Sequence, residues 1–173
     1  MRNYLNDTIL PNLQTVVHKI PGGFSWKMDF DTSTMTISGN GKCPDLGLEY
    51  YERLASQIIK IDDGITDMGN CHWNAQKLVI GKNCRNIGTT YAFDSYEVNS
   101  DNPVYASYEG CLYTKDYSKL ISTPHKDEMP KFHPNVSIIG NEAFRITGDE
   151  YMYIVIPWGV TTIEGNLFTG AGT

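Results

Sequence analysis

The sequence predicts a mainly β repeat protein, in which short strands joined by short helical or irregular turns stack into one domain. The first observation is that residues 59–69 recur, position for position, at residues 154–164. The second is that two more segments fit the same template: an apolar pair two residues apart, a turn residue, and an apolar residue seven after the pair. The third is a Phe shortly after the end of three copies. A chain built this way buries its core by stacking similar units.

The first 23 residues stand outside the repeats. Asp7 and neighbouring polar residues interrupt what would have to be a continuous apolar run, so residues 1–23 do not form a signal peptide. Residues 8–20 are compatible with a short amphipathic helix or with a strand, and Pro11 suits a first helical turn. We therefore leave the structure of this N-terminal segment open between helix and strand.

Four copies of the template follow along the chain. Their apolar pairs and closing residues are Ile59, Ile61 and Met68; Leu78, Ile80 and Ile87; Phe132 and Ile139 in a degenerate copy; and Ile154, Ile156 and Ile163. The later three are followed by Ala92-Phe93, Ala143-Phe144 and Leu167-Phe168, whereas the first is followed by Cys71-His72-Trp73. The steps of 19 residues from Ile61 to Ile80 and 24 from Phe132 to Ile156 are typical of leucine-rich repeats.

The spacing within the template predicts one strand per unit. Residues two apart lie on one face of a strand, so each pair faces the core and the residue between points outward. Gly64, Asn83, Asn135 and Gly159 occupy the turns, where Gly or Asn suits a positive φ. Stacked units of this kind predict one parallel sheet with an exposed face.

A spacer separates the second and third copies. It contains N-P-x-Y at Asn102–Tyr105, G-x-L-Y at Gly110–Tyr113 and L-I at Leu120-Ile121, and it explains the 52 residues between Ile87 and Ile139. Together with the repeat template and the following Phe, this pattern resembles the BspA-like leucine-rich repeat family over roughly residues 24–170. The resemblance implies a leucine-rich-repeat solenoid with a β-hairpin inserted at about residues 99–124.

The resemblance also implies how the domain is organised. Residues 24–41, with Trp26, Met28, Met35 and Ile37, are similar to the β-hairpin that caps the first repeat in this family. We expect a single domain over residues 24–173, with the repeats at 56–173. The family consists of cell-surface proteins, so the resemblance implies a secreted or cell-surface location.

Composition excludes several classes of partner. The 173 residues carry a formal net charge of −6, and no run of Lys or Arg offers phosphate groups a basic surface. We therefore expect no nucleic-acid partner. No window approaches the roughly 20 apolar residues of a membrane span, so we expect no membrane insertion. Nothing in the sequence indicates the oligomeric state.

No residue pattern indicates catalysis, a cofactor or a metal site. Cys43, Cys71, Cys84 and Cys111 contain no C-x-x-C pair, which argues against zinc. Cys84 takes a template position held elsewhere by Ile or Val and is expected in the core, while Cys71 and Cys111 either pair or stay free. The neighbours Cys71 and His72 point apart on regular structure, and the histidines are expected to be solvated. We expect a protein that is not an enzyme.

The outward positions of the repeats remain as the candidate site. Alternation places Lys60, Val79, Lys131 and Val155 on the exposed face, and Tyr153, Trp158, Tyr151 and Tyr96 add aromatic groups beside it. The sequence thus favours a non-catalytic module that recognises another protein, and the resemblance implies cell-surface adhesion or contact with host or matrix proteins. The alternative is a structural spacer or accessory domain of a larger surface protein, with no binding role of its own.

Overall fold

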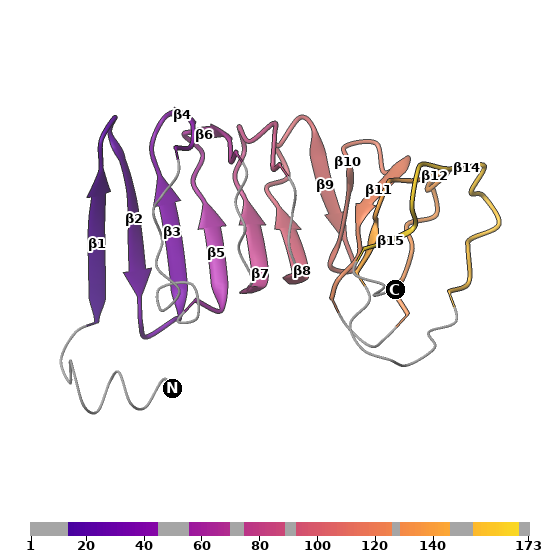
Figure 1. Cartoon of the computed structure of the whole chain (residues 1–173), viewed down its shortest axis with the longest axis horizontal. Coiled ribbons are helices and arrows are strands. Elements are labelled where there is room, and N and C mark those ends of the chain that lie inside the picture. The colour runs from indigo at the N-terminus through magenta and orange to yellow at the C-terminus, as the bar shows by residue number, and fades with distance from the viewer. Residues whose placement is uncertain are drawn as a thin grey trace.

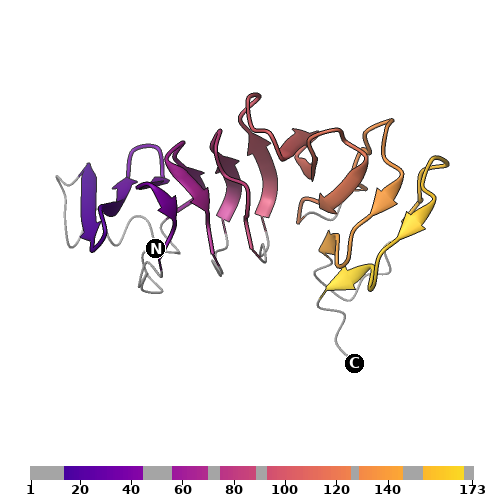
Figure 2. The ribbon, with the colours of Figure 1, turned by 90° about the horizontal axis from the view of Figure 1, so that it is seen from above.

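The structure is a computed structural model that describes residues 14–44, 56–69, 75–88, 93–125, 129–145 and 154–169. All regular secondary structure in these ranges is β-strand, so the predicted short helical turns are absent from them. The strands follow one another in a row from β1 to β8, and the remaining strands continue the row to the other end (Figure 1). Seen from above, the first strand and the last strands lie at opposite ends of this row (Figure 2).

The largest sheet has six strands in the order β1-β2-β3-β5-β7-β8. Their bounds are Thr15–Ile20, Phe24–Asp29, Thr34–Ser38, Ile58–Ile61, Ala75–Ile80 and Phe93–Val98. Strands β1, β2 and β3 pair antiparallel with one another, and β3, β5, β7 and β8 pair in parallel. The expected hairpin is thus present as β2 and β3. In the N-terminal segment, for which the sequence left helix or strand open, residues 15–20 form strand β1.

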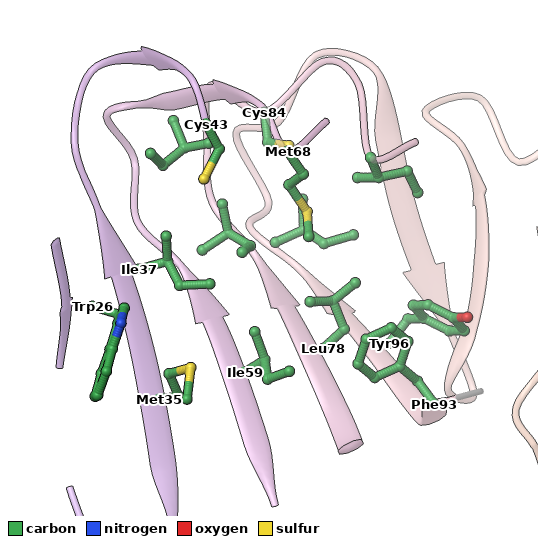
Figure 3. Close-up of a cluster of buried hydrophobic side chains, with 14 of the residues drawn as sticks. Trp26, Met35, Ile37, Cys43, Ile59, Met68, Leu78, Cys84, Phe93 and Tyr96 are labelled. Atoms are coloured by element: carbon green, nitrogen blue, oxygen red, sulfur yellow. The ribbon is translucent and has the colours of Figure 1, made fainter. Parts of the chain in front are cut away.

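The inner face of this sheet carries two rows of apolar side chains, as strand alternation requires. One row consists of the register partners Met28, Met35, Ile59, Leu78 and Tyr96. The other contains the register partners Trp26, Ile37 and Ile61, followed by Ile80 on the next strand, and all members of both rows are at most 4% exposed. Labelled members of both rows point into one interior (Figure 3). The template pairs of the first two copies are therefore core residues.

One strand of this sheet was not predicted. The template takes Phe93 as the end of the second unit, but Phe93 begins β8, and Tyr96 and Val98 pair in parallel with Leu78 and Ile80. Tyr96 was expected beside the exposed face, yet only 3% of it is exposed and its hydroxyl lies 3.0 Å from Ser122 Oγ. The prediction for Tyr96 is therefore wrong, because residues 93–98 continue the stack with an aromatic residue in place of an aliphatic one.

A second row of short backbone pairings runs beside the large sheet. It consists of β4 (Gly41–Lys42), β6 (Ile65–Asp67) and a parallel bridge from Asp67 to Asn86. Gly64 lies between β5 of the large sheet and β6, and a Cβ on this residue would lie 2.0 Å from Gly39 O. Glycine is thus required for close approach, and the predicted positive φ at this turn is wrong; positive φ occurs instead after the closing residues, at Gly69 (64°) and Gly88 (60°).

The spacer forms antiparallel strands, as predicted for an inserted hairpin. They are β9 (Tyr105–Tyr108), β10 (Cys111–Thr114) and β11 (Lys119–Ser122). Parallel strands β12 (Ile138–Ile139) and β14 (Thr162–Ile163) then extend them into a five-stranded sheet in the order β14-β12-β11-β10-β9. A separate parallel pair joins β13 (Phe144–Arg145) to β15 (Phe168–Thr169).

The last two template copies differ from the prediction. Phe132 and the pair Ile154 and Ile156 lie outside strands, although each was expected to occupy one. Phe132 still packs against the core, edge-on to Phe144 at 6.1 Å between ring centroids. These units pair instead through their closing residues, with Ile139 opposite Ile163 and Phe144 opposite Phe168.

The interior is divided into two apolar clusters. One lies under the six-stranded sheet and the other contains Tyr113, Leu120, Ile139 and Phe144. Successive residues of β10 face different clusters, because Leu112 belongs to the first and Cys111 and Tyr113 belong to the second. The inserted hairpin thus forms the wall between the two cores.

Candidate recognition surface

Two of the predicted site residues lie side by side on the outer face of the six-stranded sheet. Lys60 on β5 is the register partner of Val79 on β7. The row that contains them crosses all six strands as Val17, Lys27, Thr36, Lys60, Val79 and Glu97, and we call it the outer row. Its members are exposed or half-buried. The outer row therefore combines charged, polar and small apolar side chains.

Ion pairs on this side of the molecule bridge neighbouring units. Lys77 Nζ lies 3.2 Å from Glu97 Oε2, and Lys82 Nζ lies 3.2 Å from Asp101 Oδ2. The backbone N–H of Lys82 also donates to Asp63 Oδ1 at 2.7 Å. These exposed pairs stabilise little, because water screens them. The first pair involves Glu97, a member of the outer row.

Lys131 lies apart from Lys60 and Val79. It was expected on a strand of the repeat sheet, but residues 129–133 form no strand, and its Nζ lies 3.7 Å from Glu109 Oε2. The template failed here because its third copy lacks the first apolar residue of the pair, so that a strand has only one side chain to bury. The structure therefore does not join Lys131 to the outer row.

Beside Lys131 the structure gathers an aromatic cluster that the sequence did not indicate. His133 stacks on Tyr117 with ring centroids 4.0 Å apart and meets Tyr108 edge-on at 4.9 Å. Its Nδ1 accepts the backbone N–H of Asn135 at 3.1 Å, and the backbone N–H of His133 donates to Tyr113 Oη at 3.1 Å. The expectation of a solvated histidine is thus wrong for His133, which is half-buried and packed between residues of the hairpin.

The remaining predicted residues belong to the last unit. Val155 is 70% exposed and Trp158 is 102% exposed, the largest fraction among the exposed apolar side chains described. Trp158 lies in the turn before β14. Strand β14 lies at the opposite end of the molecule from β1 (Figure 1). Tyr151 and Tyr153 lie outside the described residues. The five predicted residues that the structure describes are therefore distributed over separate parts of the molecule and do not form one patch.

The described thiols are buried. Burial raises the pKa of Cys43 to about 11, that of Cys84 to about 11 and that of Cys111 to about 12. All three are free, and Cys84 lies in the core as predicted. A nucleophilic cysteine needs a lowered pKa and access to substrate, so these three have the opposite character. Cys71 and His72 lie outside the described residues.

Two further observations concern sites of other kinds. Within the described ranges, no three His, Cys, Asp or Glu side chains come together in a way that would hold a metal ion. The same ranges contain no helix of the length and apolar character needed to cross a membrane.

Comparison with solved structures finds two partial matches. The chain is similar to a leucine-rich repeat protein from Eubacterium ventriosum, with 16% identity and a TM-score of 0.44 over 87% of this chain and 62% of that one. It is also similar to the pneumococcal vaccine antigen PcpA, with 10% identity and a TM-score of 0.35 over 87% of this chain and 66% of that one. The chain thus spans less than two thirds of either protein. No protein-family model and no curated protein matches the sequence.

Proposed function

We propose that the chain is a BspA-like leucine-rich-repeat solenoid that recognises another protein, without catalysis, at the cell surface or after secretion. The observation that carries the proposal is the exposure of Trp158 in a turn of the last unit. In the first unit the matching turn residue is Asp63, a side chain that water solvates well. The indole of Trp158 is largely apolar, so water does not stabilise its full exposure at the same position in this way.

Energetics support a binding role for this side chain. Burial of a large apolar side chain contributes about 1.5–3 kcal/mol, and Trp is among the residues that dominate protein interfaces. Val155, three residues earlier and 70% exposed, enlarges the apolar area of the same segment. Trp158 would thus be the residue that anchors a partner, and Val155 would add apolar contact area beside it.

The outer row supplies a second contact region in this proposal. Lys60 and Lys27 occupy register positions on either side of Thr36, and both are exposed. Exposed charges of this kind orient a partner and speed its approach more than they hold it. A partner with acidic groups would match these lysines.

Surface plasmon resonance against immobilised collagen, fibronectin and glycans tests the proposal. Trp158→Ala is expected to weaken binding about tenfold or more, because an interface loses its anchor. Lys60→Glu is expected mainly to slow association and to make it less sensitive to salt. Met129→Ala is the matched control, since Met129 is an exposed apolar side chain (38%) that lies outside both the last unit and the outer row. Binding that Trp158→Ala and Lys60→Glu both leave intact would contradict the proposed surface.

A structural spacer is the second candidate function. It is favoured by the arrangement of the strands in a single row, which gives the molecule length with little lateral bulk (Figures 1 and 2). A spacer would bind none of the immobilised partners and would only hold the domains on either side of it apart. Antibody labelling of intact cells tests the surface location that both candidates share.

A further inference from the structure

A tight turn in the third unit presents an asparagine to solvent. The backbone N–H of Val136 donates to His133 O at 3.1 Å, which closes a four-residue turn with Pro134 and Asn135 at its two central positions. Proline suits the first central position, because its ring fixes φ in advance. Val136 is 2% exposed, whereas Pro134 and Asn135 are both exposed. The turn is therefore anchored in the core at one end and holds Asn135 at the surface.

The side chain of Asn135 takes no part in holding this turn. Its backbone N–H donates to His133 Nδ1 at 3.1 Å, and among the bonds that the structure describes its side-chain amide has no partner. The matching turn residue of the second unit, Asn83, differs, because its Nδ2 donates to Asp63 O at 2.8 Å. The amide of Asn135 can thus carry a substituent without the loss of a described hydrogen bond.

The sequence around Asn135 matches the acceptor pattern of N-linked glycosylation. Asn135 is followed by Val136 and Ser137, which gives Asn-x-Ser with a residue other than proline in the middle. A second such pattern in the chain, Asn6–Thr8, lies outside the described residues. Within the described ranges, Asn135 is thus the one asparagine that combines this pattern with an exposed turn.

The fold also indicates when a glycan would be added. The backbone N–H of Ser137 donates to Ser118 O at 2.9 Å, and its C=O accepts the N–H of Thr161 at 2.8 Å. The hydroxyl of Ser137 is half-buried, with its Oγ 3.4 Å from Ser118 O. A segment bonded on both sides in this way cannot extend into the active site of a transferase. Transfer must therefore precede the folding of this unit, and the folded turn then holds the glycan in water.

We propose that Asn135 is an attachment site for an N-linked glycan. The donor is a lipid-linked oligosaccharide, in which the first sugar is joined to a polyprenyl diphosphate. Nδ2 of Asn135 bonds to the anomeric carbon of that sugar and gives up one proton, while the bond from this carbon to the diphosphate oxygen breaks and the diphosphate leaves with the electron pair. The inference rests on the proposed location at the cell surface or after secretion, where such glycans are carried.

Mass spectrometry of peptides from the protein, isolated from the cells that produce it, tests the site. The peptide that contains Asn135 is expected to carry a glycan in most molecules, and enzymatic release of the glycan in isotopically labelled water should mark this residue. Measurement on peptides separates Asn135 from Asn6, which a mass of the whole chain would not.

Variants made in the same cells identify the groups that the transferase needs. Asn135→Gln and Ser137→Ala are expected to remove the glycan completely, whereas Ser137→Thr retains the hydroxyl and with it the glycan. Because transfer precedes folding, a folding defect in Ser137→Ala would not by itself cause this loss. Asn83→Gln is the matched control, since Asn83 is an exposed turn residue with no Ser or Thr two residues later, and it should leave the glycan in place.

The outcomes separate this inference from the proposed function. A chain recovered outside the cell or on its surface with Asn135 unmodified would overturn the glycan and leave the proposed location standing. A chain found only inside the cell, with Asn135 unmodified, would overturn both. A glycan on Asn135 of a chain that binds none of the immobilised partners would support this inference and contradict only the proposed recognition.

Discussion

At the scale of single residues, the template identified core positions by chemical type. Ile65, Cys84 and Val136 occupy its small apolar position and are at most 2% exposed. The template did not predict the backbone conformation of the turn at Gly64. Glycine is required there because a Cβ would clash with Gly39 O, and the φ of Gly64 is not positive. Such contact depends on a neighbouring unit, which the local pattern does not describe.

The equivalence of these positions predicts the effect of Cys84→Val. The variant should remain within about 1.5 kcal/mol of the unmodified chain at pH 7, since volumes are similar. The carbonyl that accepts the Cys84 thiol, Asn86 O, still accepts the N–H of Met68. Chemical unfolding at a series of pH values measures both this difference and the loss of stability at alkaline pH.

The alkaline behaviour follows from the raised pKa of Cys84. Burial raises this pKa from an ordinary 9.0 to about 11, so the unfolded chain loses the proton first. The stability from the neutral thiol is complete below pH 9 and is lost as pH rises toward 11. Between pH 9 and pH 11, Cys84→Val should therefore lose less stability than the unmodified chain. Ile65→Val, at the same template position, should lose as much stability as the unmodified chain. Identical pH profiles for all three proteins would contradict this assignment.

At the scale of elements, the inserted hairpin is anchored by one side chain. Asn102 is 0% exposed; its Nδ2 donates to Gly81 O (2.8 Å) and Cys84 O (2.9 Å), and its Oδ1 accepts the N–H groups of Val104 and Tyr105. It thus joins the second unit to the start of β9. The N-P-x-Y pattern has a physical basis in this junction, since an amide can serve two acceptors and two donors at once.

Asn102→Ala is expected to cost about 3 kcal/mol or more, because buried backbone groups lose their partners at roughly 1–3 kcal/mol each. Urea unfolding measures the loss. Asn99→Ala is the control, since Asn99 is exposed and its side chain accepts only the N–H of Asp101 among the bonds described. That control should cost less than about 1 kcal/mol. Equal costs for the two variants would show that the hairpin is held elsewhere.

At the scale of the whole molecule, the hairpin connects the two cores. Leu112 packs in the cluster under the six-stranded sheet, while Tyr113, the next residue, packs in the other. Strand alternation therefore makes one short element part of both interiors. The two halves of the row should resist unfolding together.

Leu112→Ala tests this connection. Removing a fully buried Leu side chain costs about 2–5 kcal/mol. Hydrogen exchange followed by mass spectrometry should show faster exchange in both β7 and β12, which lie on opposite sides of the hairpin. Val17→Ala, at an exposed position, should change neither. Faster exchange confined to one half would show that the cores unfold independently.

Local patterns along the chain were enough to predict the repeat, the N-terminal hairpin and the strands and core residues of the first two copies. These follow from local rules, since alternation and turn chemistry act over a few residues. The packing of the folded chain, by contrast, makes Phe93–Val98 a strand, leaves Phe132 outside any strand and separates Lys131 from the pair Lys60 and Val79. Each of these outcomes depends on which neighbour a segment packs against, and a periodic pattern carries no information about that neighbour.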